Sequence, residues 1–191
     1  MTFVRLIKHA NSINHQTHPS PHPLPNLAGT ATRLGSVFGD FVHHVLHYLT
    51  HTADPLNLGP PEVRNVLCER FPECQNMLET PEVLAHITRA WHKIAAYILA
   101  QSVYFSTEVD FLGQRQVDVI LEHPDATIEL VEIKTYFKKT HHVYAKAKKQ
   151  LGDSRKFILK NYPDTKLKLT ILFIRSNPSL PFKFTKRRIR P

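Results

Sequence analysis

Three charged residues interrupt apolar segments in the middle of the 191-residue chain. Asp118 lies in the apolar segment 117–121, and Glu132 and Lys134 lie in the segment 130–135. Residues two positions apart in a strand project from the same face, so Glu132 and Lys134 are predicted to lie side by side. Because an unpaired buried carboxylate is costly, we expect both acids to be paired or to bind a metal ion.

The chemistry predicted for these residues is phosphodiester hydrolysis. Two carboxylates brought together repel each other, and a divalent cation between them removes the repulsion. Hard oxygen ligands favour Mg²⁺ or Mn²⁺, which polarises a phosphoryl oxygen and lowers the pKa of a bound water. Lys134 would position that water or stabilise the developing negative charge. The alternative is a Glu132–Lys134 ion pair at a partly exposed sheet edge that takes no part in catalysis.

The hydrophobic pattern predicts the elements that position these residues. Apolar stripes at helical spacing predict helices over 35–50, 62–71 and from Pro81, where Thr80 is the expected N-cap. β-Branched and aromatic residues predict strands over 103–111, 116–122, 128–133 and 168–174, with a basic helix over 140–161 between the last two. The expected inward residues of the helix after Thr80 are Leu84, Ile87, Trp91, Ile94, Ile98 and Leu99.

The chain is expected to have three parts. A His- and Pro-rich arm covers 1–33 and is a possible contact for a protein partner, an α/β domain covers 34–175, and a basic tail covers 176–191. No run of about 18 apolar residues is present, so no membrane span is predicted. Two cysteines, Cys68 and Cys74, exclude a disulfide framework and favour an intracellular setting, with nucleus, mitochondrion and viral replication site all open.

Charge is unevenly distributed along the chain. Residues 134–191 contain 17 basic and 2 acidic residues, whereas residues 1–133 contain 8 basic and 14 acidic residues. This asymmetry favours a polyanionic partner, most simply nucleic acid. Lysines and an arginine after the Glu-x-Lys segment could grip phosphates, or could form a solvated helix face; they are Lys138, Lys139, Lys146, Lys148, Lys149, Arg155 and Lys156.

The segments around Asp118 and around Glu132-Ile133-Lys134 resemble the PD-(D/E)XK nuclease superfamily. Gly39 and His43 resemble the Gly-x-x-x-His helix motif of its RecB-like exonuclease branch. The resemblance covers about residues 35–174 and implies a restriction-endonuclease-like α/β fold. That fold is an α-β-β-β-α-β core, a mixed central sheet flanked by helices, here with an N-terminal helical segment. It implies a Mg²⁺- or Mn²⁺-dependent nuclease, an exonuclease or end-processing enzyme, acting on DNA rather than RNA.

The resemblance also implies a role for each matching residue. His43, Asp118, Glu132 and the Ile133 carbonyl would bind the metal, and Lys134 would be the catalytic lysine. Glu108 would hold a second metal and Gln150 would contact the substrate or orient the site. His44 and His47 are rivals of His43, and Asp110 is a rival of Glu108.

Two other functions remain open at this stage. One is a nucleic-acid-binding or assembly protein that has the same fold and no activity. The other is an RNA endonuclease of the viral cap-snatching type, although those enzymes usually place the lysine differently.

Overall fold

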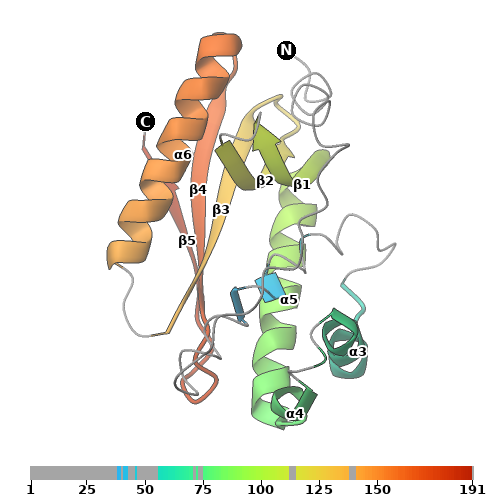
Figure 1. Cartoon of the computed structure of the whole chain (residues 1–191). Helices are drawn as coiled ribbons and strands as arrows, with labels where there is room; N and C mark the ends of the chain where they lie inside the picture. The colour runs from blue at the N-terminus through green and yellow to red at the C-terminus, as the bar shows by residue number, and fades with distance from the viewer. Residues whose placement is uncertain are drawn as a thin grey trace.

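The computed structural model is built around a five-stranded sheet that is covered by one long helix on each face (Figure 1). It describes residues 38, 39, 41, 42, 46, 56–70, 72, 75–111, 115–137 and 141–190, without the side chains of residues 70, 77, 108 and 115. The strand order follows the chain: β1 Tyr104–Phe111, β2 Arg115–Glu122, β3 Ile128–Tyr136, β4 Leu167–Arg175 and β5 Phe184–Ile189. The predicted α/β class is therefore confirmed.

The sheet is mixed because of one helical crossover. β3 and β4 pair in parallel, and α6 (His141–Asn161) connects them along one face of the sheet, whereas the other strand pairs are antiparallel. Parallel neighbours need such a crossover, and strands covered on both faces read as nearly continuous apolar runs. The first six residues of β3 are all buried, which agrees with this position.

The opposite face of the sheet is covered by α5 (Pro81–Gln101). Thr80 occupies the N-cap position and Pro81 begins the helix, as predicted, although the Thr80 side chain makes no capping hydrogen bond. Ile87, Trp91, Ile94 and Ile98 are buried, Leu84 is half-buried, and Leu99 is 39% exposed, contrary to the sequence expectation. The shorter helices α3 (Pro60–Arg70) and α4 (Gln75–Leu78) pack against α5 (Figure 1).

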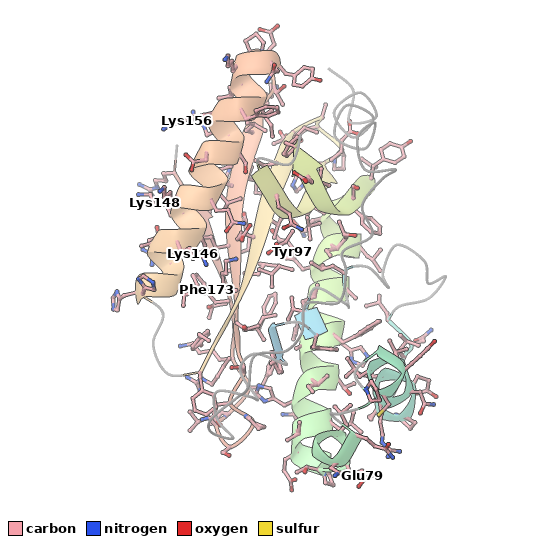
Figure 2. All side chains as sticks on the ribbon, viewed as in Figure 1. Glu79, Tyr97, Lys146, Lys148, Lys156 and Phe173 are labelled. Atoms are coloured by element: carbon pink, nitrogen blue, oxygen red, sulfur yellow. The ribbon has the colours of Figure 1, made fainter. Side chains whose placement is uncertain are left out.

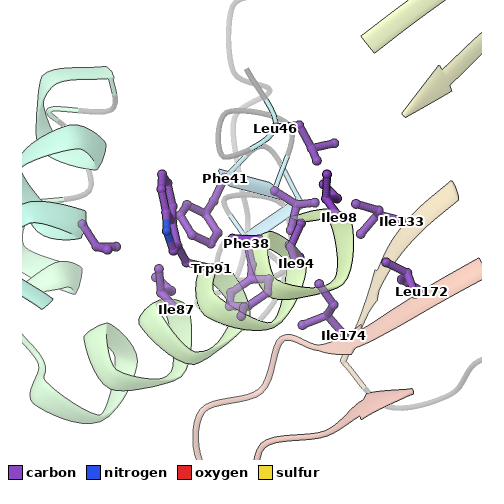
Figure 3. Close-up of a cluster of buried hydrophobic side chains, with 14 of the residues drawn as sticks. Phe38, Phe41, Leu46, Ile87, Trp91, Ile94, Ile98, Ile133, Leu172 and Ile174 are labelled. Carbon is purple, nitrogen blue, oxygen red and sulfur yellow. The ribbon is translucent and has the colours of Figure 1, made fainter. Parts of the chain in front are cut away.

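The core has two parts, one on each side of the sheet. The α5-side core joins α5 to Val131 and Ile133 of β3 and includes buried residues of the predicted early helix, namely Phe38, Phe41, Val42 and Leu46 (Figure 3). The α6-side core joins Ala147, Leu151 and Ile158 of α6 to the other face of the sheet. Such burial is worth about 25 cal/mol per Å² of apolar surface, so these two layers hold the strands in place.

The structure differs from the sequence expectation at the C-terminal end. The segment 176–191, expected to be a basic tail, contains β5, which pairs with β4. Three adjacent basic residues in this segment suggest a tail, but an edge strand tolerates charge because one of its sides faces solvent. The expected arm over 1–33 lies outside the described residues. Among the helices that the structure describes, none is long and apolar enough to cross a membrane.

Candidate nuclease site

The candidate site begins where β2 separates from β3. The two strands pair from Glu122 with Ile128 as far as Val119 with Val131, and the pairing ends there. Asp118 is the next residue of β2, and its Oδ2 accepts a hydrogen bond of 2.6 Å from the backbone N–H of Ile133. The Asp118 carboxylate thus accepts a hydrogen bond from a backbone N–H of β3 at the point where the pairing of β2 with β3 ends.

The β1–β2 hairpin changes direction at the same point. Val119 belongs to the α5-side core, whereas Val117, two positions earlier, belongs to the α6-side core. Phe111, near the end of β1, contacts Phe157 of α6, with ring centroids 5.5 Å apart. The tip of the hairpin therefore turns toward α6, and Asp118 lies at the bend.

Glu132 and Lys134 lie on the same face of β3, as their spacing predicts, and this face is covered by α6. Leu130 and Tyr136 project from the same face of β3 as Glu132 and Lys134, and they pack with the α6-side core. The Glu132 side chain is fully buried and its Oε1 forms an ion pair with Lys134 Nζ, while Lys134 is 21% exposed. Because Asp118 binds the N–H of the residue between them, its carboxylate reaches the same three-residue stretch of β3 that carries Glu132 and Lys134.

Gln150 of α6 also lies beside this bend. Its Nε2 donates a hydrogen bond of 3.4 Å to the carbonyl of Gln116, two residues before Asp118 in β2. Position 108 of β1 is opposite Asp118 in the register, since Thr107 pairs with Val119 and Val109 with Val117. The Glu108 side chain is outside the described residues. Its rival Asp110 pairs with Gln116, and Asp110 Oδ1 is buried without a hydrogen-bond partner among the described residues.

The early helix approaches β3 from the α5 side of the sheet through Gly39. A Cβ atom at Gly39 would lie 3.6 Å from Thr135 Oγ1, and Thr135 follows Lys134 in β3. The glycine of the motif that resembles Gly-x-x-x-His therefore lies next to the Glu-x-Lys segment along β3, on the face opposite the Glu132 and Lys134 side chains. His43 and its rivals His44 and His47 lie outside the described residues, so the histidine ligand stays a prediction.

The predicted phosphate-contacting residues of α6 are mostly exposed. Lys146, Lys148, Lys149 and Lys156 are exposed, and Arg155 is half-buried. Figure 2 shows Lys148 and Lys156 on the outer side of α6. Lys138 and Lys139 lie outside the described residues. A basic helix surface is thus present on α6.

Comparison with known proteins adds no family. No family model matches the chain, and no curated protein is detectably similar to it. The assignment of a function therefore depends on the geometry of the residues.

Among the described residues, two carboxylates of the candidate site are suited to a hard divalent cation. Asp118 and Glu132 are both buried carboxylates at one place, and carboxylate oxygen is the ligand that Mg²⁺ and Mn²⁺ favour. No group of three His, Cys, Asp or Glu side chains suited to a metal occurs within the described part of the chain. A third donor would come from residues beyond that part, and His43 and the Glu108 side chain are the predicted ones.

A second polar cluster, which the sequence did not reveal, lies on the α5 side of the sheet. Glu129 is fully buried, and its Oε1 accepts hydrogen bonds from Tyr97 (2.8 Å) and Thr170. Its Oε2 accepts a hydrogen bond of 2.6 Å from His123 Nε2 and lies 3.0 Å from Lys168 Nζ. Glu129 gives the same sequence signal as Glu132, an acid in an apolar strand, but these partners saturate its carboxylate.

The surroundings of Glu129 keep it charged. Burial alone would raise the pKa of Glu129, but the hydrogen bonds from Thr170, Tyr97, Lys168 and His123 hold this pKa below its ordinary value. Burial and the adjacent Glu129 carboxylate together raise the pKa of Tyr97, so Tyr97 remains a proton donor. This cluster is a satisfied network that joins α5, β3 and β4.

Proposed function

We propose that this chain is a metal-dependent phosphodiester hydrolase that acts on DNA, an exonuclease or end-processing enzyme of the PD-(D/E)XK type. The observation that supports the proposal best is that Asp118 bonds to the backbone of Ile133, between the ion-paired Glu132 and Lys134, where β2 leaves β3. The α-β-β-β-α-β order, with β3 and β4 parallel, agrees with the core that the resemblance implies.

Each residue of this site has a distinct task in the proposed reaction. Asp118 and Glu132 would hold Mg²⁺ or Mn²⁺, which when bound supplies a Lewis acid and an acidified water. The hydrogen bond from the Ile133 N–H orients the Asp118 carboxylate. Lys134, partly exposed and paired with Glu132, presents its ammonium group where negative charge on a phosphoryl group develops.

The neighbouring elements supply the rest of the proposed machinery. Gln150, bonded to the Gln116 carbonyl, lies close enough to the bend to orient β2 or to meet the substrate. The exposed lysines of α6 would attract the phosphate backbone, because opposite charge contributes to binding of any nucleic-acid sequence. Gly39, beside Thr135, brings the early helix to the α5 side of β3, opposite Glu132 and Lys134, so a role of His43 at the metal stays a prediction.

The decisive experiment compares cleavage and binding in matched variants. Labelled single-stranded DNA, double-stranded DNA and a matched RNA strand are incubated with the purified protein and Mn²⁺. We expect Asp118→Asn and Lys134→Met each to lower the DNA cleavage rate about 100-fold or more, because each removes a group that acts on the transition state. Asp164→Asn and Lys160→Met change the same residue types at exposed positions and should cleave normally.

Binding separates this proposal from its main competitor. The site variants should still bind DNA, because most of the 17 basic residues after position 133 remain. A protein that binds DNA but neither cleaves it nor takes up Mn²⁺ in calorimetry would be a nucleic-acid-binding or assembly protein on this fold. Cleavage that persists unchanged in Asp118→Asn and Lys134→Met would refute the proposed site.

A further inference from the structure

An arginine of the edge strand β5 is stacked on an aromatic ring of α6. The guanidinium carbon of Arg187 lies 3.9 Å from the centroid of the Tyr144 ring. Tyr144 in turn packs against Phe173 of β4, with ring centroids 6.4 Å apart, and Figure 2 labels Phe173 on the β-sheet beside α6. The ring is therefore supported from behind, and Arg187 is exposed in front of it.

This arrangement prepares the arginine to bind an anion. A guanidinium that rests its face on an aromatic ring keeps its N–H groups at the edges, where they match two oxygens of a phosphate. Stacking also restricts the long side chain before a ligand arrives, which lowers the entropy cost of binding. Among the residues that the structure describes, no carboxylate forms an ion pair with Arg187.

The sheet register places Arg187 in line with the candidate site. Arg187 pairs with Ile171 of β4, and Ile171 pairs with Glu132 of β3. Two strand spacings separate the backbones of Arg187 and Glu132 by about 10 Å. Both side chains lie on the α6 side of the sheet. Arg187 contacts Tyr144 of α6, and Glu132 projects from the same face of β3 as Leu130, which belongs to the α6-side core.

We propose that Arg187, supported by Tyr144, binds a backbone phosphate of the nucleic-acid substrate close to the scissile bond. The inference rests on the proposed function for the position of the scissile bond, but the phosphate contact itself needs no catalysis. Arg187 is thus a positioning residue. It extends the nucleic-acid surface from α6 across to β5.

The test uses two adjacent arginines that differ only in the face they occupy. Arg188 follows Arg187 in β5, and its charge acts on Tyr97 of α5 on the other side of the sheet. Arg187→Met and Arg188→Met therefore remove the same charge from opposite faces. Binding of fluorescein-labelled DNA is measured by anisotropy over a series of salt concentrations without divalent metal, so that no cleavage occurs.

We expect Arg187→Met to weaken DNA binding about tenfold and to reduce the slope of log affinity against log salt by about 0.9, the value for one lost phosphate contact. Arg188→Met should leave both quantities close to those of the unaltered protein. Arg187→Lys keeps the charge but loses the planar fork, so it should restore only part of the affinity. Adding Tyr144→Leu to Arg187→Met should weaken binding no further, because Tyr144 acts through the arginine.

The possible failures are distinct. Equal losses in Arg187→Met and Arg188→Met would mean that only diffuse charge matters and would overturn the inference. So would normal binding by Arg187→Met in a protein that binds DNA. A protein that binds DNA through Arg187 but cleaves nothing would overturn the proposed activity and leave the phosphate site intact. Thermal melting of each variant shows whether it is folded.

Discussion

The hydrogen bonds of Glu129 allow a direct test of how much this buried charge contributes to the stability of the fold. Glu129→Gln keeps the size of the side chain and removes its negative charge. The two hydroxyl donors, Tyr97 and Thr170, meet Oε1, while the two nitrogen donors, His123 and Lys168, meet Oε2. A glutamine can keep its oxygen toward the hydroxyl groups, but its amide N–H₂ then faces two other donors.

The magnitude follows from the contacts that are lost. Two interactions with a charged group at about 1.5–3 kcal/mol each give a loss in the free energy of unfolding of about 3–6 kcal/mol. For a chain of this length, the corresponding fall in melting temperature is about 10 °C. The exposed acid Glu69 of α3 provides the control Glu69→Gln, which should change stability by less than about 0.5 kcal/mol.

The assay is urea unfolding followed by the fluorescence of Trp91, which is the only tryptophan and is fully buried. Because the folded pKa of Glu129 lies below its ordinary value of 4.5, its charge stabilises the fold above that pH. The difference between the unaltered protein and Glu129→Gln should be constant from neutral pH to about 4.5 and narrow below it. A loss below about 1 kcal/mol at pH 7 would refute the view of Glu129 as a centre of charged hydrogen bonds.

Two further predictions concern stability. Burial lowers the pKa of His86 below 6.5, although its hydrogen bond to the Arg175 carbonyl raises it, so the unfolded chain takes up the proton first. The free energy of unfolding should therefore decline as pH falls below about 6.5. Urea unfolding at several pH values should show a shallower decline for His86→Gln, whose side chain cannot take up the proton. An equal decline with pH in both proteins would contradict this. Gly39→Ala should stabilise the protein by about 0.5–1 kcal/mol, because its Cβ would meet Thr135 at ordinary contact distance and alanine favours the helix; a lower melting temperature would contradict this.

Much of the fold could be predicted from local patterns. The strand ends and the two long helices agree with the sequence to within one or two residues, except that β3 continues to Tyr136. Periodicity predicts which faces are buried because it reflects local geometry. It fails at Leu99, near the end of α5, and at β5, whose basic residues hide a strand that pairing with β4 stabilises.

The candidate site was only partly predictable. The spacing of Glu132 and Lys134 fixes their common face, and the approach of Asp118 to Ile133 between them follows from the pairing of β2 with β3. The end of that pairing at Asp118 depends on how the hairpin bends, which no local pattern specifies. The partners of Glu129 and the stacking of Arg187 bring together residues distant in sequence, so they become visible only in the folded chain.

The position of β5 has a consequence for handling the protein. β4 has six consecutive buried residues, and β5 pairs along most of its length. Deletion of residues 184–189 would leave β4 as a long uncovered edge, which is the kind of template on which chains associate into aggregates. Lys186, Arg187 and Arg188 discourage such association at the present edge, so any shortened version of the protein needs to retain them.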